Sequence, residues 1–248
     1  MKTCQEIKSL LKVLLLVTIY VVITAGNSPA QVNTNQLQDR VIKHLANYYT
    51  NEFTISADQQ GIITVRGKMN TLFDKLKIGE LISQVKGVRG IKNMIDVNSD
   101  ITADDIIRAN IEHELDRNNA IMEPEKIKVD VNNGVVDLSG TVSYFREKLL
   151  AQSIASWQDG VTDMKSNIKV LSPASARSDE NLKEIIGDIL SRYFSLEKNV
   201  KFDINNGEVH LYGPVTSLYA KNHIQEEIQQ LLGVKGVKNE IQVENNYL

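Results

Sequence analysis

Cysteine is almost absent from this chain, because its 248 residues include only Cys4. Without further thiols, the chain cannot build a disulfide framework or a cysteine-based zinc site. The histidines form no His-Glu-x-x-His pattern, and no Gly-x-Ser-x-Gly motif is present. His223 and Glu227 are one helical turn apart, a spacing more typical of a solvated helix face than of a metal site. The sequence therefore predicts a protein without catalytic residues, metal or cofactor.

An excess of positive charge is also lacking. The chain has 28 basic and 31 acidic side chains, which gives a formal net charge of −3. Proteins that bind nucleic acid rely on many cations that neutralise phosphates. We therefore expect no nucleic-acid partner, and any contact with an anionic surface must be local.

No apolar run is long enough to span a bilayer as a helix. The run Val13–Ala25 follows three lysines and falls short of the roughly 20 residues that a spanning helix needs. Small residues at Ser28 and Ala30 suit cleavage before Gln31. Because Cys4 precedes the run, a lipoprotein signal is excluded. Residues 1–30 are thus predicted to be a secretory signal peptide, and an uncleaved N-terminal anchor is the alternative.

What the chain does contain is one pattern that occurs three times at an offset of 73 residues. The segments Gly61–Gly67, Gly134–Gly140 and Gly207–Gly213 share the same frame of glycine, strand-like residues and glycine. We expect each second glycine to lie at the exit of a strand. The structural glycines are therefore Gly61, Gly67, Gly134, Gly140, Gly207 and Gly213.

Helix signals follow each repeated segment. Good N-cap residues recur at Asn70, Ser143 and Thr216, and glycines suited to a helix C-terminus recur at Gly87, Gly160 and Gly233. Between them lie apolar residues at helical spacing: Leu149, Ile154 and Trp157 in the second copy, and Leu218, Ile224, Ile228 and Leu231 in the third. A closing apolar stretch follows each glycine and predicts a last strand.

The residues before each segment predict a helix and then a strand. Alternating apolar residues run into Asn132-Asn133-Gly134 and Asn205-Asn206-Gly207, which are strong hairpin signals. In the first copy the alternation is one residue out of step, which predicts an insertion or a bulge. Amphipathic segments upstream, such as Leu37 to Tyr48, predict the opening helices.

The order of these elements predicts an α+β fold of three tandem αββαβ domains. Each should be a three-stranded mixed sheet with both helices on one face. The first two strands are expected to be antiparallel through the hairpin, and the last two to be parallel through a right-handed β-α-β step. The expected domains are residues 34–98, 104–171 and 178–244. The connector that contains Pro173 should act as a hinge.

The segments Ile127 to Val142 with Val161 to Val170, and Val200 to Val215 with Val234 to Val243, resemble the BON (bacterial OsmY and nodulation) domain. Phe53 to Met69 with Val88 to Val97 resembles it more loosely. The resemblance implies a non-enzymatic protein that resides in the periplasm or at the outer membrane. It also implies attachment to phospholipid surfaces and a role in envelope integrity or osmotic-stress tolerance, and we expect a periplasmic protein that is peripheral to a membrane. Such proteins commonly carry two copies, so the third is a departure.

One cluster combines aromatic and basic residues at an element end, as suits a bilayer interface. It consists of Arg192, Tyr193, Phe194, Lys198 and Lys201. We predict that it contacts anionic phospholipid; the alternative is that Tyr193 or Phe194 only caps the core. The other expected class of partner is an envelope protein, for which the chain would serve as a periplasmic adaptor or scaffold.

Overall fold

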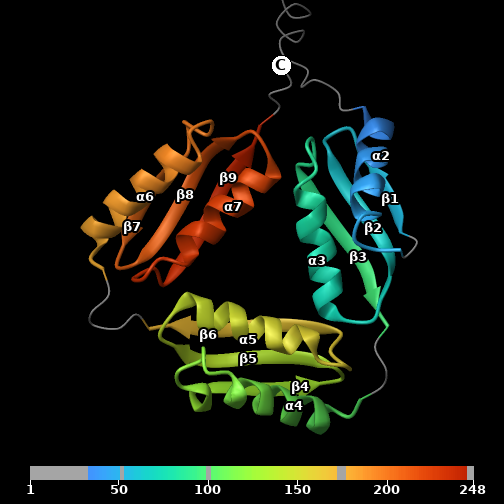
Figure 1. The fold of residues 1–248 in the computed structure, drawn as a ribbon, viewed down its shortest axis with the longest axis vertical. Coiled ribbons are helices and arrows are strands. Elements are labelled where there is room, and N and C mark those ends of the chain that lie inside the picture. Colours follow the sequence, from blue (N-terminus) through green and yellow to red (C-terminus); the bar gives the residue numbers. More distant parts are fainter. Residues whose placement is uncertain (1–32, 51–52, 99–101, 172–176, 245–248) are drawn as a thin grey trace, which may run out of the picture.

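The structure is a computed structural model that describes residues 33–50, 53–98, 102–171 and 177–244. Three α/β domains form the sides of a triangle, with one helix of each facing the middle (Figure 1). The predicted signal peptide and Pro173 lie outside the described residues. Within the described part of the chain, no helix is long and apolar enough to cross a membrane.

Each domain has the order helix, strand, strand, helix, strand. The first consists of α2 (Thr34–Leu45), β1 (Thr54–Ala57), β2 (Ile62–Met69), α3 (Leu72–Ser83) and β3 (Gly90–Val97). The second consists of α4 (Asp104–Arg117), the 3-10 turn η1 (Pro124–Lys126), β4 (Ile127–Asn132), β5 (Val135–Val142), α5 (Phe145–Trp157) and β6 (Asp163–Val170). The third consists of α6 (Asp179–Tyr193), β7 (Lys201–Asn205), β8 (Glu208–Val215), α7 (Leu218–Gln229) and β9 (Gly236–Val243).

The second strand of each domain is the middle of a three-stranded mixed sheet. The strand orders are β1-β2-β3, β4-β5-β6 and β7-β8-β9. In each sheet the first two strands are antiparallel and the last two are parallel. The predicted α+β fold of three αββαβ domains is thereby confirmed.

Alternation along the middle strands builds the core of each domain. In β2, Ile63 and Val65 are fully buried, while Thr64 between them is only partly buried. The equivalent buried pairs are Val136 and Leu138, and Val209 and Leu211. Because side chains alternate across a strand, one face of each sheet packs on its helices and the other faces outward.

The hairpins follow the predicted turn chemistry. Asn133 and Asn206 have φ of 51° and 53°, as the left-handed positions of an Asn-Gly turn require. In the first domain Ile55 pairs with Val65, ten residues later, whereas Val129 pairs with Leu138, nine residues later. The first hairpin therefore contains the one-residue insertion that the pattern predicts.

Gly140 and Gly213 lie inside β5 and β8, two residues before these strands end, and not at the strand exit that was predicted. Both have positive φ, 113° and 102°. A Cβ at Gly140 would collide with the carbonyl oxygen of Lys126, and one at Gly213 with that of Asn199. Because these glycines have no side chain, the residues that lead into the first strand can pass close to the middle strand at this point. The middle strand remains paired with the parallel last strand beyond the glycine.

The second helices begin one residue later than predicted. Their N-caps are Thr71, Tyr144 and Ser217, not Asn70, Ser143 and Thr216. Thr71 Oγ1 accepts a hydrogen bond from the Asp74 amide at 3.1 Å, and Ser217 Oγ accepts one from the Ala220 amide at 3.0 Å. Two adjacent polar residues could each serve as the N-cap. The end of the preceding strand fixes where the chain turns, and this determines which of the two caps the helix.

Two of the three residues that were predicted to form the apolar face of α5, Leu149 and Trp157, are not buried. Leu149 is exposed, and Trp157 is 53 % exposed, whereas Ala151 and Ala155 are fully buried. Small residues let α5 approach its sheet closely. Trp157 instead stacks on Phe73 of the first domain, with ring centroids 4.0 Å apart and planes 20° from parallel.

Candidate functional site

The predicted membrane cluster lies where α6 ends and the chain turns into β7. Tyr193 is the last residue of the helix and Phe194 is its C-cap. Lys198 follows in the turn, and Lys201 begins β7. The structure thus brings Arg192, Tyr193 and Lys198 to one loop and leaves Lys201 on the adjoining strand.

The side chains of this cluster have different environments. Tyr193 is 77 % exposed, so it does not cap the core. Phe194 is 8 % exposed, packs in the third-domain core and meets the ring of His223 edge-on at 5.5 Å. The alternative of a core cap is therefore correct for Phe194, which does not reach the surface that the cluster presents.

Leu196 is an apolar surface residue that the sequence pattern did not single out. It is 86 % exposed, the most of the exposed large apolar side chains. It lies beyond the helical stripe that ends near Tyr193, so periodicity provides no signal for it. An exposed leucine and an exposed tyrosine three residues apart suit insertion into an apolar or interfacial environment.

The cations of the loop differ in their partners. The Arg192 guanidinium contacts the Asp188 carboxylate at 3.1 Å, one helical turn away, and both groups are exposed. Among the described residues, Lys198 and Lys201 take part in no ion pair. In the corresponding stretch of the second domain, Lys126 pairs with Glu123 and Arg117 lies 3.8 Å from Glu114. Among the described residues, the third domain thus has two exposed apolar side chains beside two lysines that take part in no ion pair, where the second domain has one of each, Met122 and Lys128.

A buried carboxylate holds the loop in place. Glu197, 9 % exposed, accepts hydrogen bonds from the Thr216 amide at 2.9 Å and from the Thr216 hydroxyl. The bond ties the loop to the junction between β8 and α7. Tyr193 and Leu196 are therefore presented by an anchored turn.

A groove of about 480 Å³ lies beside the loop, between α6 and β7. It is lined by Leu190, Phe194, Val200 and Phe202, with Glu197 and Lys198 also contributing. Its apolar lining continues the apolar character of the loop.

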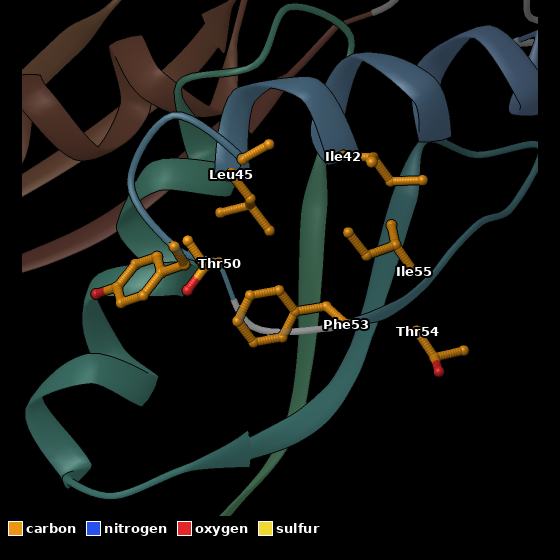
Figure 2. A pocket seen from close by; sticks show the side chains of 8 residues that line it. Ile42, Leu45, Thr50, Phe53, Thr54 and Ile55 are labelled. Atoms are coloured by element: carbon orange, nitrogen blue, oxygen red, sulfur yellow. The ribbon is translucent and has the colours of Figure 1, made fainter.

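The first domain has a larger groove, about 720 Å³, at the same place between α2 and β1. Ile42 and Leu45 of the helix face Ile55 of the strand and Phe53, which directly precedes the strand, across it (Figure 2). At its edge the Tyr49 hydroxyl donates to Asp74 at 3.1 Å, and burial together with this hydrogen bond raises the pKa of Tyr49 to about 12. Lys43 and His44 provide the basic groups in the last turn of α2.

The outward faces of the sheets carry polar pairs. His210 Nε2 and Glu240 Oε2 lie 2.6 Å apart, and Lys238 Nζ is 2.6 Å from the same carboxylate. The Lys238 and His210 hydrogen bonds lower the pKa of Glu240. On helix α7, away from the sheet faces, His223 lies near Glu226 and Glu227, at 3.7 and 4.0 Å. Within the ranges that the structure describes, no three His, Cys, Asp or Glu residues form a group that could hold a metal ion.

Comparison with known proteins identifies the repeated unit. The family model of the BON domain matches residues 33–99, 103–172 and 178–245. No curated protein matches the chain. Among solved structures, CdsD, a structural protein of the type III secretion system of Chlamydia trachomatis, is 16 % identical, with 84 % of this chain and 92 % of that chain covered and a TM-score of 0.24.

A structure of the C-terminal domain of CdsD is 17 % identical over 86 % of this chain and 99 % of that chain, with a TM-score of 0.23. The PrgH periplasmic domain is 10 % identical over 82 % of this chain and 99 % of that chain, with a TM-score of 0.21. The three family matches together cover most of the chain. The chain therefore belongs to the BON-domain family and consists of three tandem BON domains.

Proposed function

We propose that this protein is a non-enzymatic, exported protein of the cell envelope that attaches reversibly to anionic phospholipid surfaces. The observation that carries the proposal is the α6–β7 loop, where exposed Tyr193 and Leu196 adjoin the unpaired Lys198 and Lys201. Membership of the BON family and the leader-like N-terminus support its place in the periplasm. We further propose a role in envelope integrity or osmotic-stress tolerance, which membership of the BON family supports.

The energetics of the loop suit weak and reversible attachment. Each cation near an anionic bilayer contributes about 1 kcal/mol, so that Lys198 and Lys201 together contribute about 2 kcal/mol, and Arg192 adds less because Asp188 is its ion-pair partner. Tyr193 and Leu196 add interfacial burial. Because salt screens exposed charges beyond about 10 Å at 0.1 M, attachment should weaken as salt rises.

Liposome flotation tests the proposal. The protein is incubated with vesicles of neutral lipid alone or with added anionic lipid, each at low and high salt. We expect flotation with anionic vesicles at low salt and its loss at high salt. Equal recovery in the bottom fraction under all four conditions would contradict lipid attachment.

The second candidate function is a periplasmic adaptor that binds other envelope proteins. It is favoured by the open edges of the sheets, since each three-stranded sheet ends in two edge strands. Such edges accept an added strand from a partner. Failure of flotation, together with capture of defined envelope proteins by the wild-type chain, would favour this function.

A further inference from the structure

The first residue of the second helix lies against the next domain in all three copies. These residues, Leu72, Phe145 and Leu218, are 73 positions apart. Leu72 is 3 % exposed and belongs to the core cluster of the second domain. Leu218 packs against the core cluster of the first domain. Phe145 lines a pocket shared with Leu231 and Gly233 of the third domain.

The receiving surface is also the same in each copy. In the second domain it is the end of α5, where Trp157 stacks on Phe73. In the third domain it is the stretch Gln230–Val234, which lines the pocket around Phe145 and Arg146. The corresponding stretch of the first domain is residues 84–88, and its members Val85 and Val88 belong to the cluster that Leu218 contacts.

Each domain thus uses one surface to contact the next domain and a different surface to receive the previous one. A head-to-tail contact of this kind forms a closed ring when its rotation returns to the start. The contact of the first domain with the second, and of the second with the third, is accompanied by a short connector. The contact of the third domain with the first has no connector, and the start of α2 and the end of β9 lie at that corner (Figure 1).

We propose that the third domain is an intramolecular partner of the first, so that the chain forms a closed ring with pseudo-threefold symmetry. Leu218 occupies the surface formed by residues 84–88, as Leu72 occupies the end of α5, and Tyr219, which stacks on His223 of its own domain, lies at the edge of this contact. A small contact suffices, because the tether gives the two surfaces a high effective concentration. The occupant is the chain's own third domain, not that of a second copy.

Ring closure also determines where the α6–β7 loop lies relative to the first domain. Glu197 of this loop is bonded to Thr216, two residues before Leu218. The loop therefore lies beside the contact between the third and first domains, at the corner where the described chain begins and ends. Closure would hold the proposed lipid-contact loop next to the first domain.

Crosslinking of the full chain tests closure. With Cys4 replaced by serine, the chain contains no other cysteine, so that a pair can be introduced at Tyr219 and Gln84. Both positions are exposed. The control pairs Tyr219 with Lys92, which is also exposed but lies on β3. A short bismaleimide crosslinker is applied to dilute protein, and the products are separated by mass and mapped by peptide analysis.

We expect an intramolecular crosslink for Y219C/Q84C in several-fold excess over Y219C/K92C. Equal yields for the two pairs would overturn the closed ring. Crosslinked dimers in place of monomers would overturn the assignment of the partner, because the third domain of a second copy would then fill the surface.

Leu218→Asp provides an independent measurement. Small-angle scattering should show a larger radius of gyration for L218D than for the wild type, while the matched change L171D, at an exposed leucine after β6, should leave it unchanged. An unchanged radius in L218D would contradict closure through Leu218. Neither measurement contains lipid, so their outcome is independent of the proposed lipid attachment.

Discussion

Single side chains tie the loop after each first helix to the start of each second helix, and each domain does so differently. In the first domain the Tyr49 hydroxyl donates to Asp74 at 3.1 Å. In the second, the buried Glu147 accepts from the amides of Met122 and Tyr144 at 3.2 and 3.1 Å. In the third, the carboxylate comes from the loop itself, as Glu197. Every version satisfies polar groups at the same junction, so each domain has a side-chain contact between the end of its first helical region and the start of its second helix.

Glu197→Ala should destabilise the third domain by about 1–3 kcal/mol, because the amide and hydroxyl of Thr216 lose a charged acceptor. Chemical denaturation followed by circular dichroism measures the change. Glu184→Ala, at an exposed position of α6, is the control and should stay within about 0.5 kcal/mol of the wild type. A free energy of unfolding for E197A equal to that of E184A would show that the loop is held by other contacts.

Gly140→Ala and Gly213→Ala should each cost about 1–3 kcal/mol, because the new Cβ meets a carbonyl oxygen of the chain that leads into the neighbouring strand, at a positive φ. Gly187→Ala is the matched control, since nothing lies within 4 Å of a Cβ there and the residue is helical. Alanine should stabilise this helix position by up to about 1 kcal/mol. Thermal unfolding measures the midpoint of each of the three variants. An equal shift of the midpoint in all three would rule out backbone strain as the cause.

At the scale of helices and strands, the repeat made most of the fold predictable. Alignment of the three copies at the offset of 73 residues identifies the turns and the alternating strands. It also reveals the extra residue of the first hairpin, because the first copy departs there from the pattern that the other two share. Cap positions were missed by one residue, since Asn70 and Thr71 are both good caps and only the path of the preceding strand chooses between them. Phe194 and Trp157 were misplaced because neighbouring elements, not periodicity, decide which side chains they cover.

The contact between α4 and its hairpin makes the stability of the second domain depend on pH. Hydrogen bonds from the Gly134 and Asn133 amides, at 3.0 and 2.8 Å, lower the pKa of Asp104. A lowered folded-state pKa contributes stability above the ordinary value of about 4 and loses it as the pH falls below that value. The second domain should therefore lose stability in acid more steeply in the wild type than in D104N.

Unfolding midpoints measured between pH 5 and pH 3 test this dependence. Asp105→Asn removes a charge from the same helix turn without touching the hairpin and is the matched control for the helix dipole. Parallel pH profiles for the wild type and D104N would show that the hairpin bonds do not stabilise the ionised carboxylate.

At the scale of the whole molecule, the three domains are small enough that their contacts matter. A domain of this size buries only about 60 % of its unfolded surface, so that each gains from packing on a neighbour. The stacked pair Phe73 and Trp157 is the best-defined of these contacts. Its members come from different domains, and so it reports on packing between domains.

A double-mutant cycle over Phe73→Ala and Trp157→Ala should give a coupling of about 0.5–1.5 kcal/mol in the free energy of unfolding, as stacked aromatic pairs do. The cycle is its own control, because each single change removes the pair. A coupling near zero would mean that the first and second domains do not pack through these rings in solution.

The central claim is that the protein attaches to lipid through its third domain. The most direct test removes only the basic side chains at the end of α6 and in the loop that follows. The variant replaces Arg192, Lys198 and Lys201 with glutamine. The matched control replaces Arg117, Lys126 and Lys128, which occupy the corresponding stretch of the second domain, so that both variants lose the same charge. In flotation with anionic vesicles at low salt, we predict that the control floats like the wild type and that the third-domain variant stays at the bottom. Flotation of the third-domain variant equal to that of the control would contradict the claim.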